Sequence, residues 1–248
     1  ISSSGHLIIG AAVLDFNEPG IIFDVFLHLG TLLAILVVFR QEIKGMLFAP
    51  FFYLSGSRTT EIQHNLRWDL YVILSVLPAV AVGLFANDAV EEVFTNLPLV
   101  FAMLFITGIM MVISGHLPTG KVTLKGKHAF LIGCAQAMAI LPGISRSGAT
   151  IFTGMALGIN REIAARFAFI MSIPAILGAI VLHLPDLIRT PPSTGSIANI
   201  AAGTLASAVA GYFAIVLLLG VVRKNRLEWF GYYCLLLSIC GSTYLLLA

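Results

Sequence analysis

Two polar strings in an otherwise apolar chain contain the residue types needed for chemistry on an anionic group. The first string reads ISSSGH and covers residues 1–6, and the second reads LPGISRSGAT and covers residues 141–150. Together they supply hydroxyls, an imidazole and a guanidinium, from Ser2, Ser3, Ser4, His6, Ser145, Arg146, Ser147 and Thr150. A serine beside an imidazole is the minimal activated nucleophile, and an arginine is a natural clamp for phosphate or carboxylate oxygens.

Ser3 and His6 are the candidate catalytic residues of the first string. They are three residues apart at an expected helix start, so their side chains share one face of the helix. The imidazole of His6 could take the hydroxyl proton of Ser3 and later return a proton to a leaving group or to water. Either Ser3 or His6 could be the attacking group, and the sequence leaves that choice open.

The second string predicts an anion site at a break between two helices. Pro142 and Gly143 should end the first helix, and Ser145, Ser147 and Thr150 can cap the next one. The free N–H groups at that helix start and the Arg146 side chain would then face one ligand. An arginine at membrane depth costs at least about 2.5 kcal/mol, which favours a function over a purely structural arginine. Combined with the first string, these donors suit phosphoryl transfer.

The composition excludes a water-soluble protein. Of the 248 residues 58% are hydrophobic and only 10% are charged, and the mean hydropathy is +0.99. This predicts an integral, all-α, polytopic membrane helix bundle. The formal net charge of +2 gives no reason to expect a nucleic-acid partner.

Length and apolarity predict six full membrane spans, at 24–39, 69–85, 97–115, 163–184, 197–222 and 229–247. Residues 129–158 should instead enter the membrane and return to the same side as a re-entrant pair. With that topology, all of the 14 Lys and Arg residues except Arg146 and Arg189 lie on one face, as the positive-inside rule requires. If the pair crossed the membrane, this asymmetry would be lost.

The chain repeats itself at an offset of 143 residues. Residues 1–9 align with residues 144–152 and are identical at Ile1, Ser2, Ser4, Gly5 and Ile8. In the predicted topology the two copies run in opposite directions, so one membrane domain, 1–248, would contain inverted repeats at about 1–115 and 129–247. Such repeats usually build one shared site near the midplane. Secondary transporters share this design, so a transporter or lipid flippase is the alternative to an enzyme.

Residues 1–6, 23–31 (FDVFLHLGT) and 141–150 closely resemble the undecaprenyl-diphosphate phosphatase family of bacterial membranes, the bacitracin-resistance type. The resemblance implies removal of one phosphate from undecaprenyl diphosphate, which recycles the lipid carrier of cell-wall precursors. It also implies a plasma (inner) membrane location, a site open to the outer face and a divalent cation, Mg or Ca. Ser3 and His6 match the first-repeat serine and histidine of the family, and Ser145, Arg146 and Thr150 match its phosphate-binding string.

One departure from the family concerns the metal ligands. The family carries a glutamate motif just before the first serine string, and this sequence begins after that point. We therefore expect the glutamates upstream of Ile1, and the fragment could be inactive without them. Gln136 holds the equivalent position of the second repeat, and Gln136 and His28 are further candidates to line the site. The expected partners are a polyprenyl diphosphate, membrane lipids and a second copy of the chain.

Overall fold

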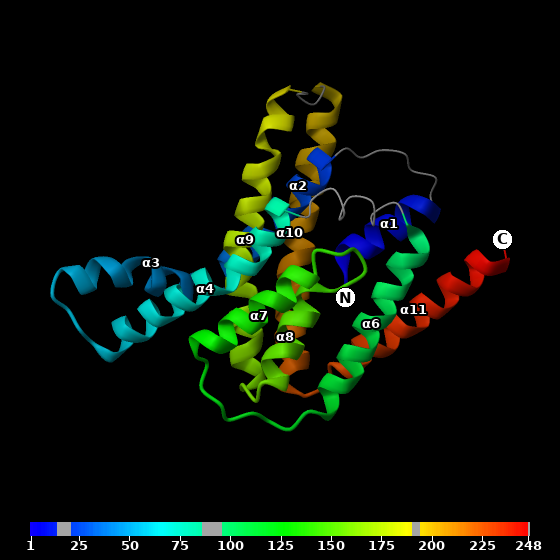
Figure 1. Ribbon diagram of the computed structural model, residues 1–248. Helices are drawn as coiled ribbons and strands as arrows, with labels where there is room; N and C mark the ends of the chain where they lie inside the picture. The colour runs from blue at the N-terminus through cyan, green and yellow to red at the C-terminus, as the bar shows by residue number, and fades with distance from the viewer. Residues whose placement is uncertain (14–20, 86–95, 190–193, 248) are drawn as a thin grey trace. The chain divides into compact units, whose positions relative to one another are not determined.

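A computed structural model describes residues 1–13, 21–85, 96–189 and 194–247, and in these residues every regular element is a helix (Figure 1). The helices are α1 (Ser3–Val13), α2 (Ile21–Val38), α3 (Arg40–Leu54), α4 (Thr60–Phe85), α6 (Leu97–His116), α7 (Gly126–Met138), α8 (Arg146–Ala156), α9 (Arg161–Arg189), α10 (Thr194–Arg223) and α11 (Glu228–Leu247). The all-α prediction is confirmed.

Five of these helices are long and apolar enough to cross a membrane: α4, α6, α9, α10 and α11. Each contains one of the predicted spans, and the count rises to six if α2 and α3 are taken together as one broken span. On α10, large apolar side chains are exposed, with Leu205 at 68% and Phe213 at 65%. Apolar surface of that extent needs lipid around it. The protein is therefore a multi-pass membrane protein.

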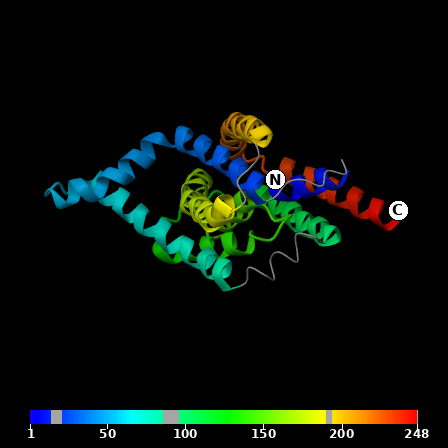
Figure 2. The ribbon, with the colours of Figure 1, turned by 90° about the horizontal axis from the view of Figure 1, so that it is seen from above.

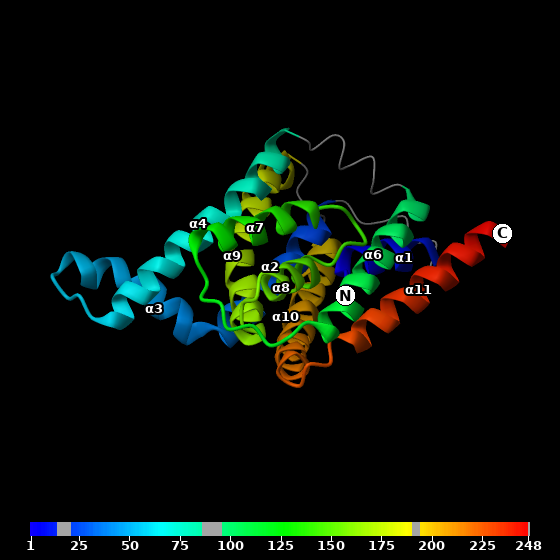
Figure 3. The same cartoon turned by 60° about the horizontal axis from the view of Figure 1, so that its bottom comes forward.

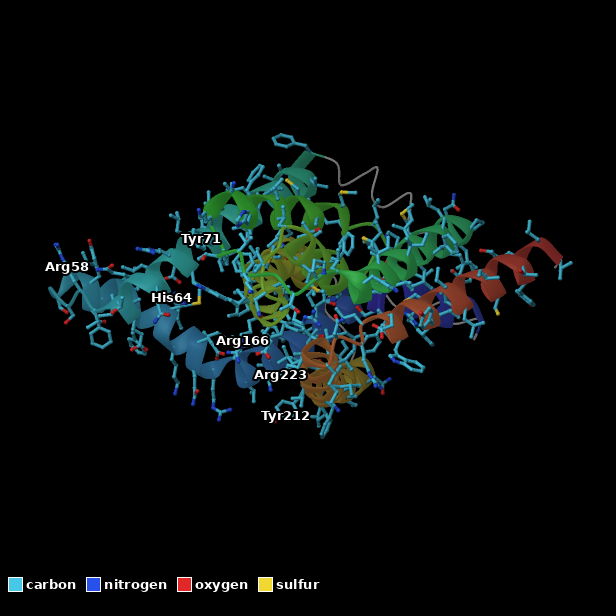
Figure 4. All side chains as sticks on the ribbon, turned by 90° about the horizontal axis from the view of Figure 1, so that it is seen from below. Arg58, His64, Tyr71, Arg166, Tyr212 and Arg223 are labelled. Atoms are coloured by element: carbon cyan, nitrogen blue, oxygen red, sulfur yellow. The ribbon has the colours of Figure 1, made fainter. Side chains whose placement is uncertain are left out.

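The connection expected between the first two spans, at residues 40–68, is largely helical. The chain bends by 82° between α2 and α3, and α3 then runs to Leu54 (Figure 2). Its charged residues kept this segment out of the predicted spans, yet its apolar and aromatic residues sustain a helix. Beyond α3, the guanidinium of Arg58 lies 5.5 Å from the centre of the Tyr53 ring, and Figure 4 shows Arg58 near the turn that leads to α4.

The contacts of the chain group into two compact units. The first comprises Ile1–Asn17, Leu74–Ala168 and Val221–Ala248, and the second comprises Glu18–Ile73 and Phe169–Gly220. Each unit draws on both predicted repeats. The division into inverted repeats stays a prediction.

In the first unit, α6 and α11 lie side by side (Figure 1). Small residues allow this close approach, since a Cβ at Gly231 would lie 2.7 Å from the carbonyl oxygen of Gly108. The helix α1 contacts α6 (Figure 3), and α8 contacts both α6 and α7. The helix α6 is thus the common support of α1, α8 and α11.

The second unit has its own apolar core, formed by buried side chains of α2, α9 and α10 that include Leu32, Ile35, Phe169, Ile170 and Ile215. A polar contact joins α2 to α10 beside this core. The Ser207 hydroxyl donates to the carbonyl of Leu27 at 2.6 Å and lies 3.2 Å from the Thr31 hydroxyl. Hydroxyls in membrane helices commonly pair in this way.

Candidate active site

The helix break predicted at residues 141–150 is present. The helix α7 ends at Met138, α8 begins at Arg146, and the two helices pack against each other. With 13 and 11 residues, each is at most about 20 Å long at 1.5 Å per residue. Neither can cross an apolar layer of about 30 Å, so the packing supports a re-entrant pair.

The turn between α7 and α8 is fixed by a threonine of α6. Gly143 has a φ of +95°, a left-handed conformation that glycine adopts without strain. The fully buried hydroxyl of Thr107 donates to the carbonyl of Gly143 at 2.9 Å and accepts from the amide of Ser145 at 3.0 Å. One side chain thus satisfies a buried acceptor and a buried donor of the irregular backbone.

Ser145 is the N-cap of α8, as predicted. Its hydroxyl accepts from the amide of Gly148 at 3.1 Å, and its carbonyl accepts from the amide of Ala149 at 2.8 Å. The capping expected of Thr150 is wrong, because its hydroxyl donates back to the carbonyls of Arg146, at 2.8 Å, and Ser147, at 3.2 Å. A threonine one turn inside the helix reaches those carbonyls more easily than the free amides at the start.

The start of α1 has the same capping geometry as the start of α8. The Ser2 hydroxyl accepts from the amide of Gly5 at 3.3 Å, and the Ser2 carbonyl accepts from the amide of His6 at 3.1 Å. The matching also extends to the next hydroxyl: Ser2 and Ser4 are 3.3 Å apart, and Ser145 and Ser147 are 3.5 Å apart. The sequence repeat at an offset of 143 therefore corresponds to two locally equivalent helix starts.

These two helix starts lie close together. A Cβ added to Gly5 would lie 3.1 Å from the Cα of Gly143, so the first turn of α1 rests on the turn that precedes α8. Ser2 and Ser145 are both buried, with 2% and 1% of their surface exposed. The two polar strings, 143 residues apart in sequence, are neighbours in the first unit.

Arg146 is the first residue of α8, and its side chain is half-buried. Within the described parts of the chain, its guanidinium makes no hydrogen bond or ion pair. The backbone amides of Arg146 and Ser147, the first two of α8, are likewise left without a helical partner. A half-buried, unpaired guanidinium beside a helix start is an arrangement that favours an anion.

The imidazole of His6 is held by two contacts, neither of them with Ser3. Its Nδ1 lies 2.6 Å from the carbonyl oxygen of Ser2, and its Nε2 lies 2.9 Å from the hydroxyl oxygen of Tyr233. The rings of His6 and Tyr233 are stacked, with centroids 5.6 Å apart and planes 10° apart. The hydroxyl of Ser3 is exposed and makes no hydrogen bond to the described residues.

Gln136 lies on α7 and is 1% exposed, yet both polar atoms of its amide lack a hydrogen-bond partner among the described residues. A substrate oxygen, a water or a bound ion could each supply the partner that this buried amide lacks. No cluster of three or more His, Cys, Asp or Glu side chains suitable for a metal occurs within the described residues. These residues alone therefore do not fit a divalent cation.

His28, the other candidate lining residue, lies on α2 in the second unit and is half-buried. Its role in the site stays a prediction. Two residues of the site were missed by sequence reasoning, namely Thr107 and Tyr233. Thr107 stands within the apolar run of α6, and Tyr233 follows Tyr232 near the start of α11. Nothing in their local sequence distinguishes them from ordinary span residues.

The fold and site define a class: a multi-pass helical membrane protein in which two serine-capped helix starts meet beside an unpaired arginine. Residues 1–240 match the family described as bacitracin resistance protein BacA, and the chain belongs to that family.

Curated relatives support this assignment over nearly the whole chain. An undecaprenyl-diphosphatase of Methanobrevibacter smithii is 41% identical over 253 residues, which covers 96% of this chain and 89% of the relative. Proteins of the same name from Syntrophotalea carbinolica and Desulfosudis oleivorans are 40% and 38% identical, again over 96% of this chain and 89% of each relative.

Proposed function

We propose that this protein is an integral-membrane phosphatase that removes one phosphate from undecaprenyl diphosphate and leaves undecaprenyl phosphate. Membership of the BacA family and relatives named undecaprenyl-diphosphatase support this reaction. The structural observation that carries it is the contact of Gly5 with Gly143, which brings both serine-capped helix starts and Arg146 into one unit. Phosphoryl transfer depends mainly on positioned donors and neutralised charge, and these elements supply both.

Arg146 would bind the terminal phosphate of the substrate. Its guanidinium can donate two parallel hydrogen bonds to phosphate oxygens, and the unbonded amides at the start of α8 add donors from the backbone. Ser147 and Ser4 would add hydroxyl contacts, while the buried caps Ser2 and Ser145 hold both helix starts in shape. These groups stabilise the transition state, whose negative charge is spread over the phosphoryl oxygens and the leaving oxygen.

His6 would act as the acid–base group, or itself as the nucleophile. In the first case a hydroxyl oxygen attacks the terminal phosphorus, the O–P bond to the lipid phosphate breaks, and the hydroxyl proton passes to the imidazole. Water then releases inorganic phosphate and restores the hydroxyl. Ser3 suits this role because its hydroxyl is exposed and uncommitted. Replacing Ser3 by alanine and trapping a phosphoryl-histidine would decide between the two residues.

The assay is phosphate release from undecaprenyl diphosphate by the full-length protein in detergent or nanodiscs. Arg146→Ala should lower kcat/KM roughly 1,000-fold, since it removes the charge that the transition state needs. Arg226→Ala is the matched control, because Arg226 is exposed in the short link between α10 and α11. Equal activity of the two variants would contradict the role of Arg146 in binding the terminal phosphate. Lipid movement across vesicles without phosphate release would instead indicate a transporter or flippase.

A divalent cation, Mg or Ca, is part of the proposal through the family alone. Chelation with EDTA should abolish phosphate release, and added Mg²⁺ or Ca²⁺ should restore it. Unchanged phosphate release after exhaustive chelation would contradict the cation requirement while leaving the phosphatase assignment intact.

We also propose that the site opens to the outer face of the plasma membrane. Ser3→Cys, made after replacing Cys134, Cys234 and Cys240, should react in intact cells with a thiol reagent that does not cross membranes. Cysteine at position 224, in place of Lys224, is the control for the opposite face, since the positive-inside rule places that residue in the cytoplasm. Labelling at position 224 but not at position 3 would show that the site opens to the opposite face of the membrane.

Cross-linking in native membranes would test the expected homo-oligomer.

A further inference from the structure

The hydrogen bonds of His6 fix which ring nitrogen carries the proton. A carbonyl oxygen can only accept, so the 2.6 Å contact with Ser2 requires a hydrogen on Nδ1. In the neutral ring Nε2 is then the acceptor, and the Tyr233 hydroxyl must be the donor in the 2.9 Å contact. The Tyr233 hydroxyl therefore occupies the lone pair of Nε2, the nitrogen that would receive a proton once that hydroxyl turns its hydrogen away.

The two contacts of His6 differ in what they can hold in place. Ser2 caps the same short helix four residues before His6, so its carbonyl fixes the ring only relative to α1. Tyr233 comes from α11, 227 residues away in sequence. The near-parallel rings, with planes 10° apart, restrict tilting of the imidazole as well as its rotation.

The helix α11 also connects His6 to the second polar string. It lies along α6, and α6 carries Thr107, which bonds to both Gly143 and Ser145. The helix α6 therefore supports both the start of α8 and, through α11, the ring of His6, and all of these elements belong to the first unit. Catalytic groups need placement to within about 0.5 Å, which a side chain near the end of a short helix does not achieve alone.

We propose that Tyr233 is a positioning residue of the phosphatase: it orients His6 so that the proton-accepting Nε2 keeps a fixed place relative to the start of α8. This inference rests on the proposed function. Tyr233 acts here through His6 and has no assigned contact with substrate. Its hydroxyl supplies the hydrogen bond, and its ring supplies the stacking.

The test separates the hydroxyl from the ring. Tyr233→Phe removes only the hydroxyl and should lower kcat about tenfold with KM unchanged, the usual effect of losing a partner that orients a functional histidine. Tyr232→Phe is the matched control, because Tyr232 is the adjacent tyrosine and contacts Trp229 edge-on at 6.5 Å between centroids. It should keep the full kcat. Thermal unfolding of both variants shows whether the fold is equally preserved.

A spectroscopic measurement tests the contact independently of turnover. In ¹⁵N-histidine-labelled protein, the His6 signals are assigned by their loss in His6→Gln. The Nε2 resonance should shift in Tyr233→Phe and stay in place in Tyr232→Phe.

Equal kcat for the two phenylalanine variants would overturn the positioning role of Tyr233, as would an unmoved Nε2 resonance. Wild-type protein that releases no phosphate would overturn the proposed function instead. In that case the ¹⁵N spectrum alone would decide whether Tyr233 orients His6.

Discussion

Gly5 lies directly against Gly143, with little room for a side chain between them: a Cβ at Gly5 would be 3.1 Å from the Cα of Gly143. Two backbone segments that are far apart in sequence are thereby in contact where each polar string begins its helix. The separation of His6 from Arg146 depends on this contact, because each residue lies within one turn of it.

Gly5→Val should push α1 away from the turn at Gly143 and lower phosphate release roughly 100-fold, because a displacement of about 1 Å between reacting groups has that effect. Gly10→Val is the control on the same helix, since nothing lies within 4 Å of a Cβ at Gly10. Both variants make the same glycine-to-valine change in helix propensity. Comparable kcat/KM values for the two would contradict a role for the Gly5–Gly143 contact.

Thr107→Val should destabilise the protein by roughly 2–5 kcal/mol, because it leaves the Gly143 carbonyl and the Ser145 amide buried without partners. Valine has nearly the same shape as threonine, so the change removes the hydroxyl and little else. Thr107→Ser keeps the hydroxyl and should retain most of the stability. Thermal unfolding in detergent measures the stability of both variants. A valine variant as stable as the serine variant would show that the Thr107 hydroxyl is dispensable.

Gln136→Leu separates stability from activity. Removing an amide that is buried without partners should leave stability unchanged or raise it by about 1 kcal/mol. If the amide serves substrate or a bound cation, phosphate release falls at the same time. Thermal unfolding and the phosphate assay on the same preparation show the two effects. A variant that is less stable and fully active would mean that Gln136 supports only the fold.

The long helices and the break before Arg146 were predictable because their signals are local. Apolar runs of membrane length define α4, α6, α9, α10 and α11, and Pro142 with Gly143 marks the end of α7. The Ser145 cap and the equivalence of the two helix starts also follow from short strings. By contrast, α3 was missed because its charges resemble those of a loop.

The contacts that assemble the site could not be read from the sequence. Thr107 and Tyr233 act on residues 36 or more positions away, at Gly143 and at His6. A threonine in an apolar helix usually bonds to its own backbone, and a tyrosine there is an ordinary span residue. The imidazole of His6 contacts the Ser2 carbonyl and the Tyr233 hydroxyl in this structure, so the predicted pairing of Ser3 with His6 stays a prediction.

The two buried serines have a further consequence for the chemistry. The hydroxyls of Ser2 and Ser145 each accept a hydrogen bond from a backbone amide and each lie beside a second serine hydroxyl. If either serine attacked phosphorus, its helix start would lose this cap. The buried serine of each repeat is thus the cap of its helix, and we expect it to stay unchanged through turnover. Only the neighbouring side chains of the two strings are then free to change hydrogen-bond partners during a catalytic cycle. The repeated motif thus supplies the same support twice for a single reaction site.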